Sequence, residues 1–280
     1  MVEDFNRITV EPLAGSIGAE IKGVYISESP DLDVISEIRS AFLKYNVIVL
    51  RDQDITSDQY MNFAEKFGDP SEYPFIQGLP NYPYINPIIK LEDEKVNFGG
   101  TWHTDTAYLN EPPLGTMLLA KEVPPTGGDT IFANLYSAYE ALSEGLKEVL
   151  NSMNAIHSSL KADASKTRED RIKDNGRKGA GEFSSCHPVI RTHPETGKKA
   201  IYVNLGHTVR FDGWTEEESR PLLEFLYGHC IKPEFTCRIK WEVGSLVFWD
   251  NRCSLHNPVN DYHGYKRVMH RITLKGDTPV

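Results

Sequence analysis

The chain has 280 residues, a formal net charge of −10 and an isoelectric point near 5.4. Nucleic acids and anionic membranes attract basic surfaces, so this acidic balance argues against both and leaves a small molecule as the expected partner. The segment from Met1 to Phe5 lacks the basic and apolar parts of a secretion signal, and no apolar run approaches the roughly 18 residues of a membrane span. We therefore expect one cytoplasmic domain over residues 1–280.

The cysteines favour the same compartment. Cys186, Cys230, Cys237 and Cys253 show no Cys-x-x-Cys spacing, which suits a reducing environment where thiols serve as small core residues. Cys253 lies close to His256 in the sequence, yet we expect it to pack in the core, because free cysteine is commonly buried.

The first third of the chain predicts two helices on either side of a strand. Apolar residues recur at helical spacing over Asp31–Asn46, and Val47–Leu50 is a short apolar run typical of a buried strand. A second helix is expected over Thr56–Phe67, because a polar capping sequence begins it and a glycine and a proline follow it.

Further helices are expected in the middle of the chain and strands near its end. Apolar spacings of three and four predict a helix over Leu135–Met153, and a capping-box sequence at Thr215 predicts another over 216–229. Pro221 suits a helix interior poorly, so we expect a shifted start or a kink. Alternation over Phe235–Trp241 and the apolar run Ser245–Trp249 predict strands, and strands at both ends with helices between them suit a β-sandwich covered by helices.

Residues 158–186 form a charged, glycine-containing segment without apolar periodicity. The simpler interpretation is a surface insertion. The alternative is an active-site lid that closes over bound substrate and excludes water.

The most informative stretch is Trp102-His103-Thr104-Asp105, followed much later by Leu255-His256-Asn257. In an extended strand His103 and Asp105 project from one face and can reach one metal ion. With His256 they supply two imidazoles and a carboxylate, a set that leaves coordination positions open on iron(II). A His-x-Asp pair alone is weak support, because a lone histidine is more often structural.

The segment Arg267–Leu274 reads as a strand that places Arg267, Met269 and Arg271 on one face. Buried guanidinium groups need an anionic partner. That partner is either an acidic side chain of the protein or a dicarboxylate that chelates the metal at one end and meets Arg267 at the other.

Four segments stand in an order that resembles a known family: Trp102–Asp105, Pro124–Thr130, Trp249–Arg252 with His256, and Arg267–Arg271. They are similar to the motifs of the taurine dioxygenase and chlorophenoxyacetate dioxygenase family, whose members use iron(II), 2-oxoglutarate and dioxygen. The similarity runs nearly end to end, from Ile8 to Asp277. It implies a mainly β fold with covering helices around a double-stranded β-helix (jelly-roll, cupin-like) core, and an assembly of two or four subunits.

The resemblance also implies roles for individual residues. His103, Asp105 and His256 correspond to the iron ligands, and Thr130 with Arg267 corresponds to the pair that holds the remote carboxylate of 2-oxoglutarate. Arg271 lies near the co-substrate and corresponds to an anion contact of the substrate. The implied reaction oxidises a small anionic or zwitterionic substrate and releases succinate and carbon dioxide, with hydroxylation or carbon–heteroatom cleavage favoured over halogenation because Asp105 is retained.

The substrate pocket departs from that of taurine dioxygenases, which makes taurine a doubtful substrate. Tyr73 stands near the position of a sulfonate-binding histidine, and His207 replaces a phenylalanine. With Tyr108 they suggest a pocket of hydrogen-bonding aromatic groups beside Arg271, although each could equally pack in the core.

Three alternatives remain open at this point. The same cofactors could catalyse desaturation or oxidative rearrangement of an amino-acid derivative. A zinc-dependent hydrolase could use the same ligands, but it would give no role to Thr130 and Arg267. A metal-stabilised binding module without catalysis is the third.

Overall fold

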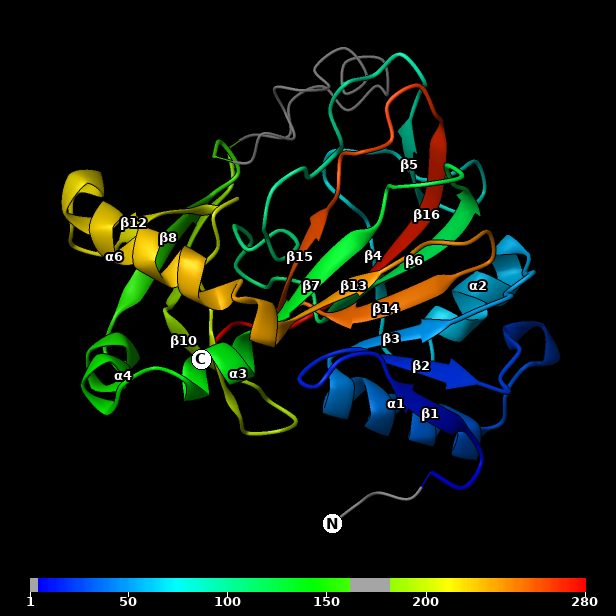
Figure 1. The fold of residues 1–280 in the computed structure, drawn as a ribbon, viewed down its shortest axis with the longest axis horizontal. Helices are drawn as coiled ribbons and strands as arrows, with labels where there is room; N and C mark the ends of the chain where they lie inside the picture. The colour runs from blue at the N-terminus through cyan, green and yellow to red at the C-terminus, as the bar shows by residue number, and fades with distance from the viewer. Residues whose placement is uncertain (1–4, 162–181) are drawn as a thin grey trace.

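The computed structural model describes residues 5–161 and 182–280, and the protein is mainly β with covering helices (Figure 1). The largest sheet in the described residues has the strand order β1-β2-β3-β14-β6-β16-β4, and β5 pairs with β16 beside this path. Its strands are β1 (Thr9–Pro12), β2 (Ala19–Lys22), β3 (Val47–Leu50), β4 (Pro70–Ser71), β5 (Asn86–Lys90), β6 (Gly115–Glu122), β14 (Leu246–Asp250) and β16 (Arg267–Leu274).

A second sheet has the order β13-β7-β15, with β13 at Thr236–Ile239, β7 at Thr130–Asn134 and β15 at Ser254–Pro258. The strands expected over Phe235–Trp241 and Ser245–Trp249 are therefore confirmed as β13 and β14. The first begins one residue later than expected because a 3-10 turn, η2 (Pro233–Phe235), precedes it, and it also ends earlier, at Ile239.

An apolar cluster fills the space between these two sheets. Val247 and Met269 come from the large sheet, whereas Phe132 and Ile239 come from the second sheet, and all are buried. Phe132 packs on Trp249 with 5.5 Å between the ring centroids. Leu118 of β6, His256 of β15 and Arg267 of β16 line one of the cavities of the candidate site.

The predicted helices of the first third are confirmed. The helix α1 (Leu32–Tyr45) begins where the Asp31 side chain accepts the amide of Val34 and ends at Asn46, whose φ of 65° is left-handed. It packs along β2, β3 and β14, and Figure 1 shows it next to β2 and β3. The helix α2 (Ser57–Ala64) has the expected capping box at Thr56 and ends earlier than predicted.

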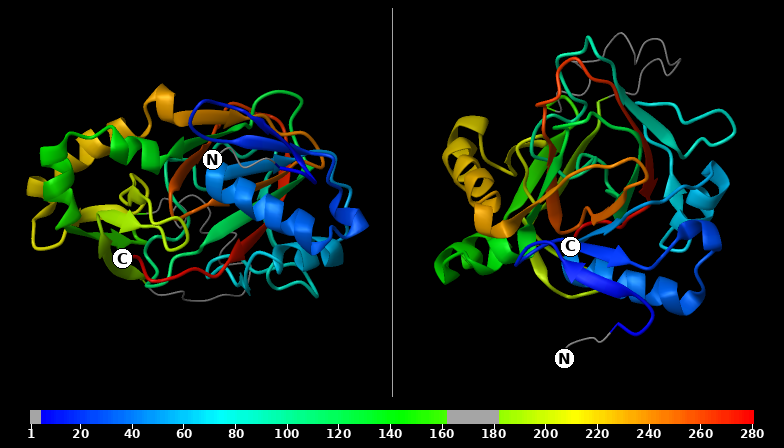
Figure 2. Two further views of the ribbon diagram at one scale, coloured as in Figure 1. Left: turned by 90° about the horizontal axis from the view of Figure 1, so that it is seen from below. Right: turned by 45° about the vertical axis from the view of Figure 1, so that its right-hand side comes forward.

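The single helix expected over Leu135–Met153 was wrong. Two helices occupy this range, α3 (Leu135–Glu140) and α4 (Glu144–Asn151), because the Ser143 side chain accepts the amide of Leu146 and caps a new helix. The helix α6 (Glu216–Cys230) begins as predicted, with no shift of its start despite Pro221. It lies beside β12 and α3, away from α1 in each view (Figures 1 and 2).

The middle of the chain also contains strands that the expected run of helices did not include. They form two small sheets, β12-β8-β9 and β10-β11, with β8 at Asn154–Ser158, β9 at Ser184–Pro188, β10 at Ile190–Thr192, β11 at Lys199–Ile201 and β12 at Thr208–Phe211; a 3-10 turn, η1, spans Ile26–Glu28. The lid hypothesis for residues 158–186 falls largely on 162–181, outside the described residues. Among the residues described, no helix has the length and apolar character needed to cross a bilayer.

Candidate active site

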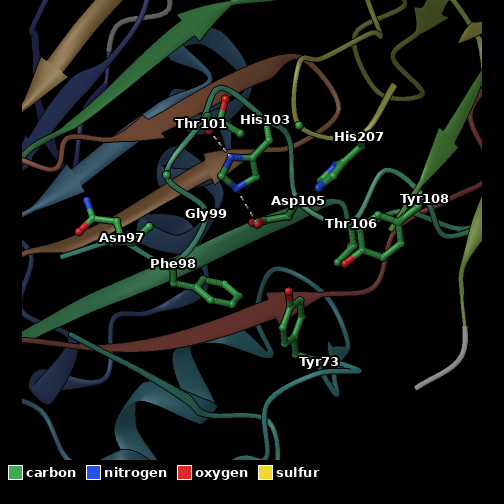
Figure 3. Close-up of a pocket in the computed structure, with 13 residues that line it drawn as sticks. Tyr73, Asn97, Phe98, Gly99, Thr101, His103, Asp105, Thr106, Tyr108 and His207 are labelled. Carbon is green, nitrogen blue, oxygen red and sulfur yellow. Dashed lines mark hydrogen bonds and ion pairs between the residues drawn. The ribbon is translucent and has the colours of Figure 1, made fainter. Parts of the chain in front are cut away.

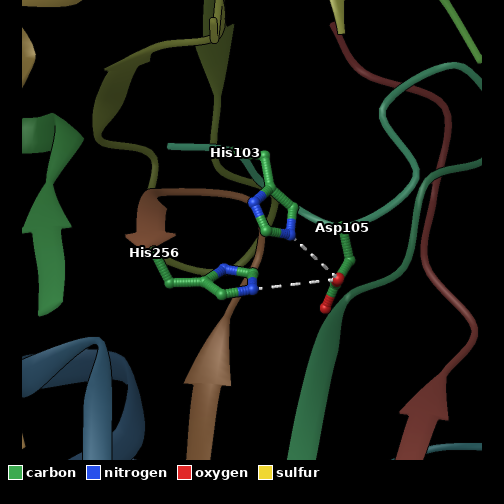
Figure 4. Close-up of side chains that lie close together, drawn as sticks. All are labelled: His103, Asp105 and His256. Carbon is green, nitrogen blue, oxygen red and sulfur yellow. Dashed lines mark ion pairs between the residues drawn. The ribbon is translucent and has the colours of Figure 1, made fainter. Parts of the chain in front are cut away.

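His103, Asp105 and His256 converge, although not in the way the sequence suggested. His103 forms an isolated antiparallel bridge with His256 of β15, and Asp105 begins a turn rather than continuing a strand. Thr104 points away and donates its hydroxyl to the carbonyl of Asn251 at 2.7 Å. The Nε2 atoms of His103 and His256 each lie 3.9 Å from Oδ1 of Asp105, as Figure 4 shows. The three side chains are thus arranged around one point, and the extended-strand geometry is corrected to a bridge followed by a turn.

Both imidazoles are held neutral and in place. Nδ1 of His103 lies 2.7 Å from the carbonyl of Thr101, so it carries the hydrogen and leaves the lone pair on Nε2. Burial lowers the pKa of His103. Burial and the neighbouring His103 together lower the pKa of His256 to about 3, and the His256 ring packs against Trp249 at 4.8 Å between centroids. Neutral imidazole is the form that binds a metal ion.

Asp105 is held in its ionised form. Burial alone would raise its pKa, but the neighbouring side chains of His256, Arg271 and His103 outweigh burial and lower the pKa of Asp105 to about 2. The Thr116 hydroxyl donates to Oδ2 of Asp105 at 2.6 Å. This bond fixes the carboxylate and leaves Oδ1 facing the two imidazoles.

The backbone next to His103 needs glycine at position 99. Gly99 has a φ of 65°, and a Cβ atom there would lie 2.9 Å from Cε1 of His103. A side chain would strain the backbone and displace the imidazole.

One cavity beside the three side chains contains the residues expected to bind 2-oxoglutarate. It is lined by Ile88, Phe98, His103, Asp105, Leu118, Thr130, Trp241, Trp249, His256, Pro258, Arg267 and Arg271. Thr130 is buried and its Oγ1 accepts from Nε1 of Trp241 at 3.0 Å, which leaves the hydroxyl hydrogen free to donate. Nε and Nη2 of Arg267 have no hydrogen-bond partner among the described residues. A buried cation aimed into a cavity in this way fits an anionic ligand.

A second cavity, which shares Phe98, His103 and Asp105 with the first, contains the three aromatic groups predicted to contact substrate, Tyr73, Tyr108 and His207 (Figure 3). The His207 ring lies 4.9 Å from that of Tyr108, and its Nδ1 has no partner among the described residues. Burial, and then His103, lowers the pKa of His207. The guanidinium of Arg271, which lines the first cavity, stacks on Tyr73 of the second at 4.0 Å, with Nε and Nη2 unpaired among the described residues. The cavity therefore has an apolar wall with a few polar atoms directed inward.

A second group of potential ligands, His193, Asp250 and Cys253, is already saturated by the protein. His193 Nδ1 accepts backbone amides and its Nε2 lies 3.0 Å from Asp250, whose carboxylate also binds Arg252. Cys253 is buried, as predicted, and its Sγ accepts a hydrogen bond from Nδ2 of Asn46. Of these two groups, the His103 group lines the cavities described above.

Comparison with known families gives one decisive result. Residues 9–273 match the family described as taurine catabolism dioxygenase TauD, TfdA family. This chain belongs to the TauD/TfdA family. Like its family, it is an iron(II)- and 2-oxoglutarate-dependent dioxygenase, and the alternatives of a zinc hydrolase and a noncatalytic module are not retained.

Individual relatives agree with the family. An alpha-ketoglutarate-dependent sulfate ester dioxygenase of Pseudomonas putida is 34% identical over 282 residues, covering 98% of this chain and 91% of that protein. The structure of a taurine dioxygenase from Burkholderia xenovorans superimposes with a TM-score of 0.84 at 33% identity, covering 98% of this chain and 91% of the other. A structure of AAD-2 in complex with Mn(II) and N-oxalylglycine gives a TM-score of 0.79 at 28% identity, covering 97% and 98%.

Several residues of this TauD/TfdA-family site were not anticipated from the sequence. Thr116 and Trp241 bind the side chains of Asp105 and Thr130, and Phe98 lines both cavities. Thr116 lies in β6 and Trp241 follows β13, and at these positions the sequence indicates ordinary core residues. Phe98 had no distinguishing signal.

Proposed function

We propose that His103, Asp105 and His256 bind the iron(II) ion and that Thr130 and Arg267 bind the remote carboxylate of 2-oxoglutarate. The observation that carries this proposal is that the three ligand side chains gather in the wall of one cavity, which also contains a buried, partly unpaired guanidinium. Two neutral imidazoles and an ionised carboxylate are the donor set that iron(II) oxygenases use. Bound iron(II) with 2-oxoglutarate and dioxygen supplies oxidation of a substrate carbon, with release of succinate and carbon dioxide.

The substrate that this site fits best is a small anion with an uncharged tail. Arg271 offers unpaired N–H groups to a sulfate, sulfonate or carboxylate group, and its stacking on Tyr73 fixes the plane of the guanidinium. Asp105 is the one acidic residue among those lining the two cavities, and we assign it to the metal. An ammonium group on the substrate would have no carboxylate of its own to meet.

Within this class we propose a sulfate ester or a related organosulfur anion, in line with the relative from Pseudomonas putida. Insertion of one oxygen atom into the C–H bond next to the ester oxygen gives a carbon that bears both hydroxyl and sulfate. That carbon loses hydrogen sulfate to give an aldehyde. The second oxygen atom enters succinate. Tyr73, Tyr108 and His207 would orient the tail so that this C–H bond faces the metal.

The substrate proposal predicts a clear order of turnover. With iron(II) and 2-oxoglutarate, we expect kcat/KM for a short alkyl sulfate such as hexyl sulfate to exceed that for taurine by about tenfold or more, because burial of an unpaired ammonium is costly. Succinate and aldehyde are measured together, with hexanol as the uncharged control. Equal or faster oxidation of taurine would overturn the proposed substrate class while leaving the cofactor assignment intact.

Three further points belong to this proposal. We infer that the large sheet and the β13-β7-β15 sheet are the two faces of a double-stranded β-helix, since both pack on one apolar cluster. We also infer that the chain forms one domain that works in the cytoplasm. A homodimer or homotetramer stays a prediction, to be measured by sedimentation.

Thr116 should tune metal affinity through Asp105. Replacement Thr116→Val removes the hydroxyl that donates to Oδ2, and we expect Mn(II) to bind about tenfold more weakly in a chelator competition. Thr273→Val is the matched control, because Thr273 pairs with Thr116 across β16 and β6 and its hydroxyl has no partner among the described residues. Equal metal affinity in the two variants would remove Thr116 from this role.

A further inference from the structure

Asn251 begins the turn that joins β14 of the large sheet to β15 of the second sheet, and it is fully buried. Its Oδ1 accepts from Nε1 of Trp249 at 3.0 Å and from the backbone amide of Asp105 at 3.3 Å. Both of these N–H groups can only donate, so they fix which end of the carboxamide is the oxygen. The NH2 group of Asn251 must therefore point the other way.

The NH2 group of Asn251 meets the hydroxyl of Thr116. Nδ2 of Asn251 donates to Oγ1 of Thr116 at 2.9 Å, and the same Oγ1 donates to Oδ2 of Asp105 at 2.6 Å. The NH2 group cannot accept and the carboxylate cannot donate, so the single hydroxyl hydrogen goes to Asp105. We call this series of bonds, from Trp249 through Asn251 and Thr116 to Asp105, the Asn251 relay.

The Asn251 relay occupies one oxygen of Asp105 and leaves the other facing the imidazoles. Oδ2 receives the Thr116 hydroxyl, whereas Oδ1 lies 3.9 Å from Nε2 of each imidazole (Figure 4). The relay also reaches another proposed ligand, because the Trp249 ring packs against His256 with 4.8 Å between the centroids. One carboxamide therefore bears on two of the three side chains assigned to the metal.

The turn that carries Asn251 is also held by a separate set of bonds. Arg252 donates to both carboxylate oxygens of Asp250, through Nε at 2.8 Å and through Nη2 at 2.6 Å, and its Nη1 donates to Glu195 at 2.7 Å. The backbone amide of Asn251 donates to the carbonyl of Leu114 at 3.0 Å. The turn is thus held independently of the Asn251 side chain, which can be replaced to change the relay alone.

We propose that Asn251 is a positioning residue that limits Asp105 to one metal-binding oxygen, Oδ1, by directing the Thr116 hydroxyl onto Oδ2. The inference rests on the proposed function, because it takes Asp105 as a metal ligand. A carboxylate that bound through both oxygens would fill a coordination position that the reaction needs open. Without the Nδ2 donor the hydroxyl can turn away, and Oδ2 is then free to approach the metal.

Asn251→Asp removes the donor half of the carboxamide and keeps the acceptor half. The new side chain has the same size and still accepts from Trp249, but it competes with Asp105 for the Thr116 hydroxyl. A double-mutant cycle with Thr116→Val cancels the effect of the added charge, which acts in both backgrounds. In a chelator competition, we expect Asn251→Asp to raise the Kd for Mn(II) by about fivefold more with threonine at position 116 than with valine, the effect of one hydrogen bond.

The electron paramagnetic resonance spectrum of the enzyme saturated with Mn(II) gives a second readout. Both Asn251→Asp and Thr116→Val should change this spectrum, because each frees Oδ2 of Asp105 and so alters the oxygen ligands of the metal. A loss of stability alone would leave the spectrum of the bound metal as it is in the wild type. If Asn251→Asp does not fold, Asn251→Ala gives the same comparison without an added charge.

Asn46→Asp is the matched control. Asn46 is another buried asparagine bonded to the same turn, but its Nδ2 donates to Sγ of Cys253 at 2.8 Å rather than to Thr116. This variant should change the Kd by the same factor with threonine or valine at position 116 and should keep the wild-type spectrum.

Three results would overturn the Asn251 relay alone: equal factors for Asn251→Asp in the two backgrounds, an unchanged spectrum, or coupling of the same size in Asn46→Asp. Binding of Mn(II) to Asp105→Ala with wild-type affinity would overturn the proposed function and the relay together.

Discussion

Replacement of His256 by alanine is expected to abolish 2-oxoglutarate turnover. His256 provides one of the two imidazoles that face Oδ1 of Asp105, and its ring packs against Trp249. Substitution of groups that merely orient a metal ligand costs about 10- to 100-fold, so loss of a direct ligand should lower succinate formation by at least about 1,000-fold. Metal affinity should fall in parallel, which calorimetric titration with Mn(II) measures.

A matched histidine separates metal binding from general damage to the fold. His270 lies on β16 between the two arginines, but it occupies the outer, half-buried face of the strand. His270→Ala should keep both metal binding and turnover. If His256→Ala retained wild-type affinity for Mn(II), or if His270→Ala lost as much activity, His256 would not be a ligand.

Residues that carry the chemistry could be predicted from the sequence because each stands in a compact motif. On β16 the alternation of side chains was enough to place Arg267, Met269 and Arg271 on one buried face, and the burial pattern of the strand agrees. The helix α1 was predicted from its apolar stripe, and the Asp31 cap seen in the structure agrees with the start that the stripe indicated.

Features that depend on partners distant in the chain could not be predicted in this way. The His-x-Asp pair looked like part of a strand, but pairing with His256 ends after one bridge and a turn brings Asp105 back toward both imidazoles. Thr116 and Trp241 have the polarity and spacing of ordinary strand residues, so only the packed fold reveals which side chains they orient. The division between α3 and α4 had a local cause, the Ser143 cap, but the continuous apolar spacing concealed it.

Arg267→Gln should selectively weaken binding of 2-oxoglutarate. The guanidinium is buried, Nε and Nη2 have no partner among the described residues, and its Cζ lies 5.4 Å from the Trp241 ring, so its charge is available to a ligand in the cavity. Loss of one partner of a buried, hydrogen-bonded charge pair costs at least about 2 kcal/mol, and we expect about a 100-fold rise in the Kd for 2-oxoglutarate. Mn(II) affinity should stay within about twofold of wild type, because glutamine keeps the polarity of the position and no proposed metal ligand changes.

The neighbouring cation provides the comparison. Lys266 pairs with Glu122 at 2.8 Å on the surface, and an exposed ion pair of this kind contributes little to binding in the cavity. Lys266→Gln should therefore bind 2-oxoglutarate as the wild type does. Succinate, which retains the remote carboxylate but lacks the 2-oxo group, should also bind more weakly to Arg267→Gln. A variant that lost affinity for 2-oxoglutarate but bound succinate normally would show that Arg267 contacts the metal-chelating end of the co-substrate, and the orientation proposed for it would have to be reversed.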